Sequence, residues 1–266
     1  MIPKIIHYCW FGGKPLGELE LKCIDSWKKY MPEYEIKLWN EENYDVNKIP
    51  YIRDAYKEKK YAFVSDYARF DILNQYGGIY FDTDVQVLKP LDDIVAKGPF
   101  LGQEAGIAKL AVAPGLGMAS EANNHFFASV LEYYKSLNFY KQNGEYNLVT
   151  VVQYVTNLLL ERGLKQTNEI QNVEGFFIYP PEYFCPMHSW TKEVNITDKS
   201  YTIHLYNASW LDEEQKKKND EIKWLSKFLG YYVSYLIVTY KYQIKNQGLG
   251  SIFSFTLRKI KNKLEK

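Results

Sequence analysis

The stretch "GGIYFDTDVQVL", residues 77–88, decides how this sequence is interpreted. Two glycines precede a short apolar run, residues 79–81, which leads directly into the acids Asp82 and Asp84. A short apolar run bounded by turn residues is typical of a buried strand. Because ligands bind at the carboxyl ends of strands in open α/β sheets, the two acids fall where a site is expected.

The segment upstream of the two glycines predicts a helix. Ser65 or Asp66 can cap its first turn, and Gly77 can end it. The apolar residues between these points recur at helical spacing, at Ala68, Ile72, Leu73 and Tyr76. The sequence therefore predicts a helix that packs closely against the following strand through a glycine link.

Segments farther along the chain alternate between strand-like and helix-like patterns. Residues 4–10, 18–31 and 32–39 give strand, helix and strand, which favours a β-α-β unit with a parallel pair. Later strand-like segments are 99–104, 109–114, 176–186 and 200–210, and later helix-like segments are 123–137 and 147–162. This order predicts an α/β domain with a mixed sheet.

The spacing of Asp82 and Asp84 has a chemical consequence. In a regular strand, residues i and i+2 point to the same side, so the two carboxylates could converge. Converging carboxylates repel each other unless protons or a cation relieve the charge. A hard divalent ion such as Mg²⁺ or Mn²⁺ prefers oxygen ligands and keeps positions open for substrate phosphates. The alternative is that the motif only forms a turn after the strand.

A second charged pair, Asp66 and Arg69, lies on the helix before the strand. The two residues are three apart and so share one helix face. Beside a paired-acid site they could bind the hydroxyls of a polar ligand. The alternative is an exposed intrahelical ion pair, which contributes only about 0.3–0.5 kcal/mol.

The bulk properties set the class of protein. The 266 residues fit one large domain, or one domain with a small appendage, and 46% are hydrophobic. A net charge of +1 argues against a nucleic-acid partner. Cys9, Cys23 and Cys185 show no metal-type or disulfide spacing, which favours a reducing compartment. With no recognisable signal peptide or spanning run, a cytoplasmic location is expected.

Positive charge gathers at the C-terminus. From Lys241 onward, seven basic residues oppose one acid, so this tail carries +6 and the rest of the chain −5. The 13 uncharged residues at 228–240 are too few to span a bilayer comfortably. Residues 211–266, read as helices, fit an extension that contacts an anionic membrane. The alternative is a helical cap on the core with a solvated basic end.

Three blocks together resemble glycosyltransferase family 32 and its relatives, which include bacterial capsular-polysaccharide transferases and the glucosyltransferase domains of large clostridial toxins. The central block is S-D-x-x-R at 65–69 followed by G-G-x-Y-x-D-x-D at 77–84. The others are "IPKIIHYCWFGG" at 2–13 and "IHLYNASW" at 203–210. The resemblance implies a GT-A nucleotide-sugar-binding fold with a mixed, mostly parallel sheet over 1–210. Residues 211–266 would form a C-terminal helical segment.

The resemblance also implies roles for individual residues. The metal, Mn²⁺ or Mg²⁺, would be bound by Asp84, Asp82 and His204. The catalytic residues would be Asp82, Asp84 and Arg69. The nucleotide-sugar would be bound by Tyr8, Trp10, Ser65, Asp66, Arg69, Tyr80, Asp82, Ser209 and Trp210. For His204, Tyr8, Trp10 and Tyr80 the alternative is a place in the core.

The implied activity is retaining transfer of a sugar from a nucleotide-sugar, with a UDP-sugar expected, to a glycan or lipid-linked glycan acceptor. Capsule or other surface-polysaccharide synthesis, at the inner face of the cell membrane, is the expected setting. Two alternatives use the same acids. A phosphoryl- or nucleotidyl-transfer enzyme would be expected to carry a P-loop, which the sequence lacks. A calcium-dependent carbohydrate-binding protein would need more oxygen ligands in one loop.

Overall fold

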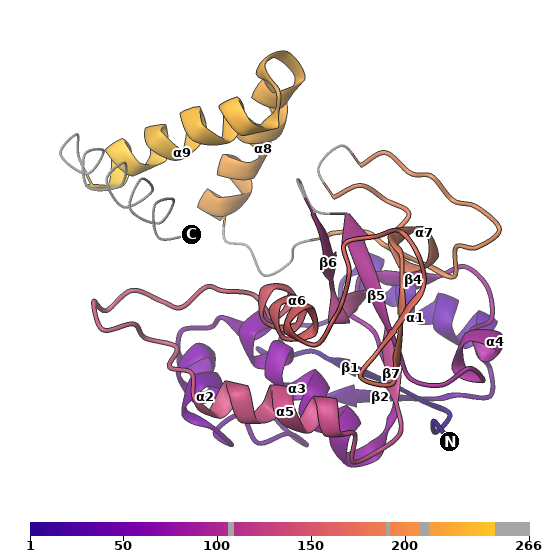
Figure 1. The fold of residues 1–266 in the computed structure, drawn as a ribbon. Helices are drawn as coiled ribbons and strands as arrows, with labels where there is room; N and C mark the ends of the chain where they lie inside the picture. The colour runs from indigo at the N-terminus through magenta and orange to yellow at the C-terminus, as the bar shows by residue number, and fades with distance from the viewer. Residues whose placement is uncertain (106–108, 190–191, 208–212, 248–266) are drawn as a thin grey trace. The chain divides into compact units, whose positions relative to one another are not determined.

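The computed structural model describes residues 1–105, 109–189, 192–207 and 213–247. The chain divides into two compact units, Met1–Asn207 and Ala208–Lys266. The first unit is an α/β domain built on a central sheet, and the second contains two helices (Figure 1). The α/β class and the C-terminal helical segment that the sequence predicts are both confirmed.

The central sheet has eight strands in the order β2-β1-β3-β7-β5-β9-β8, with β6 paired to β5. Its strands are β1 (Ile5–Cys9), β2 (Glu35–Trp39), β3 (Gly78–Tyr80), β5 (Phe100–Ala105), β6 (Leu110–Val112), β7 (Met118–Ser120), β8 (Gln171–Val173) and β9 (Phe176–Tyr179). The strands β4 (Val85–Val87) and β10 (Thr202–His204) form a separate two-stranded sheet. β2, β1, β3, β5 and β9 run in one direction, and β7, β8 and β6 run against them. The prediction of a mixed, mostly parallel sheet is confirmed.

Helices cover the sheet on both faces. They are α1 (Glu18–Tyr30), α2 (Pro50–Lys57), α3 (Tyr61–Tyr76), α4 (Asp92–Val95), α5 (His125–Lys135), α6 (Val151–Glu161) and α7 (Pro181–Phe184). Successive strand residues enter different cores: Tyr8 and Ile79 pack with α1, whereas Cys9 and Tyr80 pack with α2, α3, α5 and α6. The alternation of side chains along each strand therefore builds two hydrophobic layers, one on each face of the sheet.

The helix α3 begins earlier than the sequence suggests. The prediction that Ser65 or Asp66 caps it is wrong, because the helix starts at Tyr61 and both residues lie inside it. Phe63 and Val64 are buried in the core, so packing extends the helix ahead of the polar pair. Its predicted end is confirmed: Gly77 adopts a φ of 64° and donates its N–H to the Leu73 carbonyl.

A buried histidine ties the first strands to the end of α3. His7 lies within hydrogen-bond distance of the Gly77 carbonyl through Nε2, at 2.9 Å, and Trp39 Nε1 donates to His7 Nδ1 at 3.0 Å. Both bonds are satisfied only by a neutral ring with its proton on Nε2. Burial lowers the pKa of His7 to about 4, against the ordinary 6.5.

This histidine predicts how stability depends on pH. Because the folded-state pKa is depressed, the unfolded chain binds more protons between about pH 6.5 and 4. The free energy of unfolding should therefore fall by about 3 kcal/mol on acidification through this window. Denaturant unfolding across this pH range measures the effect, and His7→Gln should lose this component of the pH dependence. His125→Gln, at an exposed position, is the control and should keep the full acid sensitivity. If His7→Gln also keeps it, the assignment fails.

The second unit contains α8 (Glu213–Leu229) and α9 (Tyr231–Gln247). Gly230, with a φ of 71°, separates the two helices. The uncharged run at 228–240 thus crosses a helix break instead of forming one helix. Among the described residues, no helix has the length and apolar character needed to cross a membrane.

Candidate active site

The two acids of the motif lie in a turn after β3. The Val85 N–H donates to the Asp82 carbonyl at 3.0 Å, and the next strand, β4, pairs with β10 outside the central sheet. The expectation that strand alternation brings the carboxylates together is therefore wrong. The turn and the strand β10 place them instead, at the carboxyl end of β3.

Asp82 is held by three groups from separate parts of the chain. Arg69 Nη2 lies 3.2 Å from Asp82 Oδ1, and the Tyr80 hydroxyl donates to the same oxygen at 3.0 Å. The backbone N–H of Asp82 donates to the Gly115 carbonyl at 3.0 Å. With these contacts on one side, the carboxylate is fixed in orientation, while its side chain stays 30% exposed.

Arg69 and Asp66 form a buried ion pair behind Asp82. Arg69 Nη2 lies 3.0 Å from Asp66 Oδ1, and the guanidinium carbon lies 4.9 Å from the centre of the Tyr80 ring. Burial raises the pKa of Asp66 to about 6, opposed by Arg69. Burial alone would lower the pKa of Arg69, but the carboxylates around it, Asp82 first, raise it. The exposed-pair alternative for Asp66 and Arg69 is wrong, because both side chains are buried.

Asp84 faces a different set of partners. His204 Nε2, at the end of β10, lies 3.0 Å from Asp84 Oδ1, and the Asn207 N–H donates to Asp84 Oδ2 at 2.9 Å. Burial opposes ionisation of Asp84, but His204 and the N–H donor outweigh it and lower its pKa. For His204, burial favours the neutral ring, yet Asp84 raises its pKa overall.

Asp82, Asp84 and His204 fit a divalent metal. One ligand atom from each lies within 4.8 Å of the others. Ligands on one such ion, with bonds of about 2.0–2.2 Å, lie at most about 4.4 Å apart, so a small adjustment closes the set. His204 Nδ1 is buried without a hydrogen-bond partner among the described atoms, and Nε2 is the ring nitrogen that faces Asp84. The two carboxylates suit either Mg²⁺ or Mn²⁺, and the imidazole is a better ligand for Mn²⁺.

A glycine that the sequence did not single out is part of this site. Gly115 lies in the 3₁₀ turn η1 (Pro114–Leu116), and a Cβ added there would stand 1.8 Å from Asp82 Oδ2 and 3.1 Å from Arg69 Nη1. Its φ is not positive, so space and not backbone conformation requires glycine. The signal in the sequence was only the segment "APGLGM" between two strands.

A second set of residues missed from the sequence lies behind His204. The Tyr206 ring packs edge-on to the imidazole at 4.2 Å, and its hydroxyl donates to Glu104 Oε2 at 3.0 Å. The same hydroxyl lies 2.8 Å from Cys185 Sγ. Tyr206 has a φ of 51°, unusual for a residue other than glycine. Glu104 is half-buried, and burial raises its pKa.

We expect Tyr206→Phe to lower the free energy of unfolding by about 1.5–3 kcal/mol. The change removes the donor to Glu104, and hydrogen bonds to charged groups are the stronger ones. Tyr140→Phe is the matched control, because Tyr140 also donates to a carboxylate, Glu58, at 2.7 Å, but on the exposed surface. Thermal and denaturant unfolding of both variants measure the difference. Equal losses would contradict a special role for the half-buried Tyr206 hydroxyl.

Of the other predicted site residues, Tyr8, Trp10 and Ser65 make contacts outside the cluster of Asp82, Asp84 and His204. Tyr8 is buried and packs edge-on against Trp27 at 5.6 Å. Trp10 follows β1, and its indole N–H donates to the Lys14 carbonyl at 2.6 Å. Ser65 donates to the Tyr61 carbonyl at 3.2 Å, and its own carbonyl accepts from Arg69 Nε at 3.1 Å. Ser209 and Trp210 lie outside the described residues.

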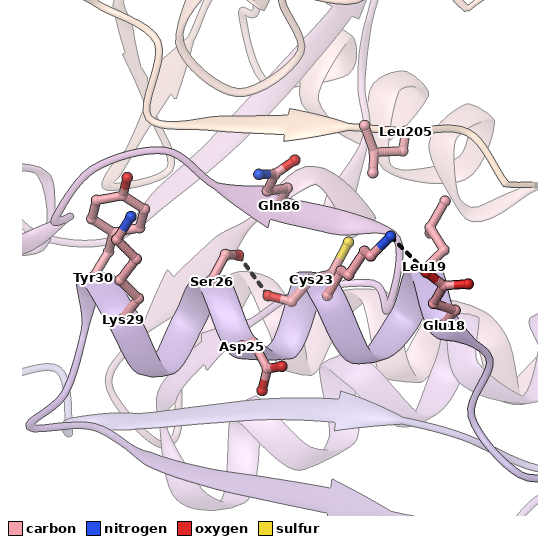
Figure 2. A pocket seen from close by; sticks show the side chains of 10 residues that line it. Glu18, Leu19, Cys23, Asp25, Ser26, Lys29, Tyr30, Gln86 and Leu205 are labelled. Atoms are coloured by element: carbon pink, nitrogen blue, oxygen red, sulfur yellow. Dashed lines mark hydrogen bonds and ion pairs between the residues drawn. The ribbon is translucent and has the colours of Figure 1, made fainter.

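A groove with a volume of about 610 Å³ runs along α1 near the site (Figure 2). It is lined by Glu18, Leu19, Lys22, Cys23, Asp25, Ser26, Lys29, Tyr30, Gln86 and Leu205. Leu205 connects it to the acids, since its N–H donates to the Asp84 carbonyl at 2.9 Å. None of the three candidate metal ligands lines the groove itself.

Comparison with known proteins agrees with this geometry. Residues 17–101 match the family model described as "Glycosyltransferase sugar-binding region containing DXD motif". This range contains Asp66, Arg69, Asp82 and Asp84 but ends before His204. The match supports the predicted glycosyltransferase class, and the GT-A type of fold stays a prediction. Family 32 and the capsule type stay predictions.

Curated relatives carry transferase names. The chain is 28% identical over 202 residues to mannosyl phosphorylinositol ceramide synthase CSH1 of Saccharomyces cerevisiae, covering 69% of this chain and 49% of that protein. It is 26% identical over 227 residues to the uncharacterized glycosyltransferase L373 of Acanthamoeba polyphaga mimivirus, covering 79% and 84%. The chain thus spans about half the length of the yeast protein.

Among solved structures, the PaToxG glycosyltransferase matches 60% of this chain and 69% of its own, with 23% identity and a TM-score of 0.46. The family match itself rests on the segment that holds the buried ion pair and both motif acids. Residues 17–101 are therefore similar to the sugar-binding region of glycosyltransferases that contain a DXD motif, and Asp82-Thr83-Asp84 is the D-x-D sequence within this range.

Proposed function

We propose that this chain is a metal-dependent, retaining glycosyltransferase that moves a sugar from a nucleotide-sugar to a glycan or lipid-linked acceptor. The observation that carries the proposal is the convergence of Asp82, Asp84 and His204 at the carboxyl end of β3. Ligand sites in open α/β sheets lie at this edge. The three residues come from two segments more than a hundred positions apart, so the cluster is a product of the tertiary fold.

The metal would be held by Asp82, Asp84 and His204. When bound, a divalent ion supplies Lewis-acid stabilisation of the charge that develops on the leaving diphosphate. Arg69 and Tyr80 orient Asp82, and the Asn207 N–H orients Asp84. These contacts leave the site little freedom to reorganise, which is what electrostatic catalysis requires.

The donor would lie beside the acids, with Asp66 and Arg69 near its ribose or sugar hydroxyls. Tyr8, Trp10, Ser65, Tyr80, Ser209 and Trp210 complete the proposed donor site. Retention would proceed by front-face transfer, in which the departing phosphate oxygen takes the proton of the acceptor hydroxyl. No side chain then has to act as a nucleophile.

The nature of the substrates is also a proposal. We favour a UDP-sugar as the donor and a precursor of capsule or another surface polysaccharide as the acceptor. The name of the yeast relative, mannosyl phosphorylinositol ceramide synthase, adds mannose as a sugar and a phosphorylinositol ceramide as an acceptor to be tested. An acceptor of this kind agrees with a cytoplasmic enzyme that works at the inner face of the membrane.

The test is metal-dependent hydrolysis of nucleotide-sugars without acceptor. A panel of uridine, guanosine and cytidine donors is assayed with Mn²⁺, with Mg²⁺ and with chelator. We expect turnover with one donor, and a loss of at least about a hundredfold in Asp84→Asn. Asp198→Asn, an exposed acid, is the matched control and should keep full activity. If Asp84→Asn, still folded, retains the metal-dependent rate of the wild type, the proposal is wrong.

A further inference from the structure

The two-helix unit exposes an apolar face. Its large exposed side chains gather near the break between α8 and α9, and they are Trp224, Phe228, Leu229, Tyr232, Val233 and Ile237. Phe228 and Tyr232 are 70% and 69% exposed, which is far more than a side chain in a core retains. Apolar patches of this kind on a protein surface mark sites of interaction.

This face is distinct from the face on which the helices pack together. Ile222, Ser234 and Val238 are buried, and α8 and α9 contact each other extensively. The rings of Trp224 and Phe228, one helical turn apart, lie 5.5 Å from each other on the exposed side. The hairpin therefore already has its own packed interface, and the exposed aromatic side chains are additional to it.

The charge of this part of the sequence indicates the kind of partner. Residues 222–266 hold nine basic residues and one acidic residue, a net +8, so the preceding 221 residues carry −7. Lys223 and Lys227 alternate with Trp224 and Phe228 along α8. No acidic residue occurs from 222 to 264. Aromatic residues interleaved with lysines match the boundary of an anionic bilayer, where rings enter the headgroup region and lysines meet lipid phosphates.

We propose that the exposed face of the α8–α9 hairpin inserts into the headgroup region of an anionic lipid bilayer. The helices are not suited to cross the membrane, so the binding is interfacial. The basic residues that follow add electrostatic attraction. This proposal deepens the peripheral location proposed above by naming the residues that make the contact. Binding is measured without donor or acceptor, so its failure and the failure of the transferase proposal are distinguishable.

The experiment is vesicle flotation of the full chain. Extruded vesicles of phosphatidylcholine alone, or with about a third phosphatidylglycerol, are compared. We expect binding to the anionic vesicles, and at least about tenfold weaker binding by the double variant Trp224→Ser/Phe228→Ser. The single variant Trp224→Phe should bind the anionic vesicles as the wild type does, because an aromatic ring is kept. Leu148→Ser and Ile196→Ser, at exposed apolar positions of the first unit, should bind as the wild type does.

Three results would overturn the proposal. The first is no binding to either vesicle by the folded wild-type chain. The second is unchanged binding by the double variant, which would assign the contact to the basic residues alone. The third is an oligomer that the double variant converts to a monomer, measured by light scattering, with no effect of lipid; the face would then contact a second copy. Circular dichroism and thermal unfolding confirm that the exposed substitutions leave the fold intact.

Discussion

Arg69→Met should lower the free energy of unfolding by about 3–5 kcal/mol, the largest stability effect that we expect from a single substitution in this site. Arg69 is buried and pairs with Asp66 at 3.0 Å and Asp82 at 3.2 Å. Methionine keeps much of the apolar volume but leaves the buried Asp66 carboxylate without its cation. The cost is therefore electrostatic and not a packing defect.

The pH dependence of this variant provides a second readout. The pKa of Asp66 is already about 6 and would rise further without Arg69. A carboxyl group whose pKa is raised in the folded state loses stability as the pH rises from its unfolded value through its folded value. The variant should therefore be less destabilised near pH 5 than near pH 8, as measured by denaturant unfolding at both values.

Arg53→Met is the matched control for this substitution. Arg53 Nε also pairs with an aspartate, Asp54, at 2.9 Å, but its side chain is 42% exposed. Exposed ion pairs contribute at most about 1 kcal/mol, so this variant should unfold almost as the wild type does. If Arg69→Met costs no more than Arg53→Met, the buried pair does not have the importance that we assign to it.

Gly115→Ala should reduce the turnover of nucleotide-sugar roughly a hundredfold while the protein remains folded. An added Cβ would stand 1.8 Å from Asp82 Oδ2, which no side-chain contact tolerates, so the carboxylate must move. Arg69 and Tyr80 restrict where it can go. A shift of about 1 Å in a metal ligand is enough for a loss of this size.

A double-mutant cycle decides whether the effect passes through Asp82. Asp82→Asn, Gly115→Ala and the combined variant are assayed for turnover, with stability measured for each. If the methyl group acts only by displacing the Asp82 carboxylate, the combined loss will be close to that of Asp82→Asn alone. Fully additive losses, or near wild-type turnover by Gly115→Ala, would contradict this account.

The local features that the sequence predicted correctly share one property. The β-α-β opening, the end of α3 at Gly77 and the strand before Asp82 all depend on hydrophobic periodicity and on glycine within one segment. The sequence erred where tertiary contacts override a local signal. Buried Phe63 and Val64 extend α3 past its polar cap candidates, and the turn after β3 replaces the strand geometry expected for the two acids.

The residues that sequence analysis missed are those whose partners are distant in the chain. Gly115 is recognisable only because Asp82 lies against it, 33 positions earlier. Glu104 and Cys185 meet at the Tyr206 hydroxyl, and the hydrogen bond between Tyr206 and Glu104 joins residues 102 positions apart. The hydrophobic pattern within a short segment of sequence contains no information on which distant residues meet.

The sequence by itself determined the α/β class, the mixed sheet and the motif acids Asp82 and Asp84, because periodicity and short-range spacing encode them. Only the tertiary structure decided what surrounds those acids. It buries the Asp66–Arg69 pair, brings His204 on β10 to within 3.0 Å of Asp84, and requires glycine at 115. The physical reason is that burial and electrostatic contact depend on which segments pack together in space, and that packing is set by the whole core.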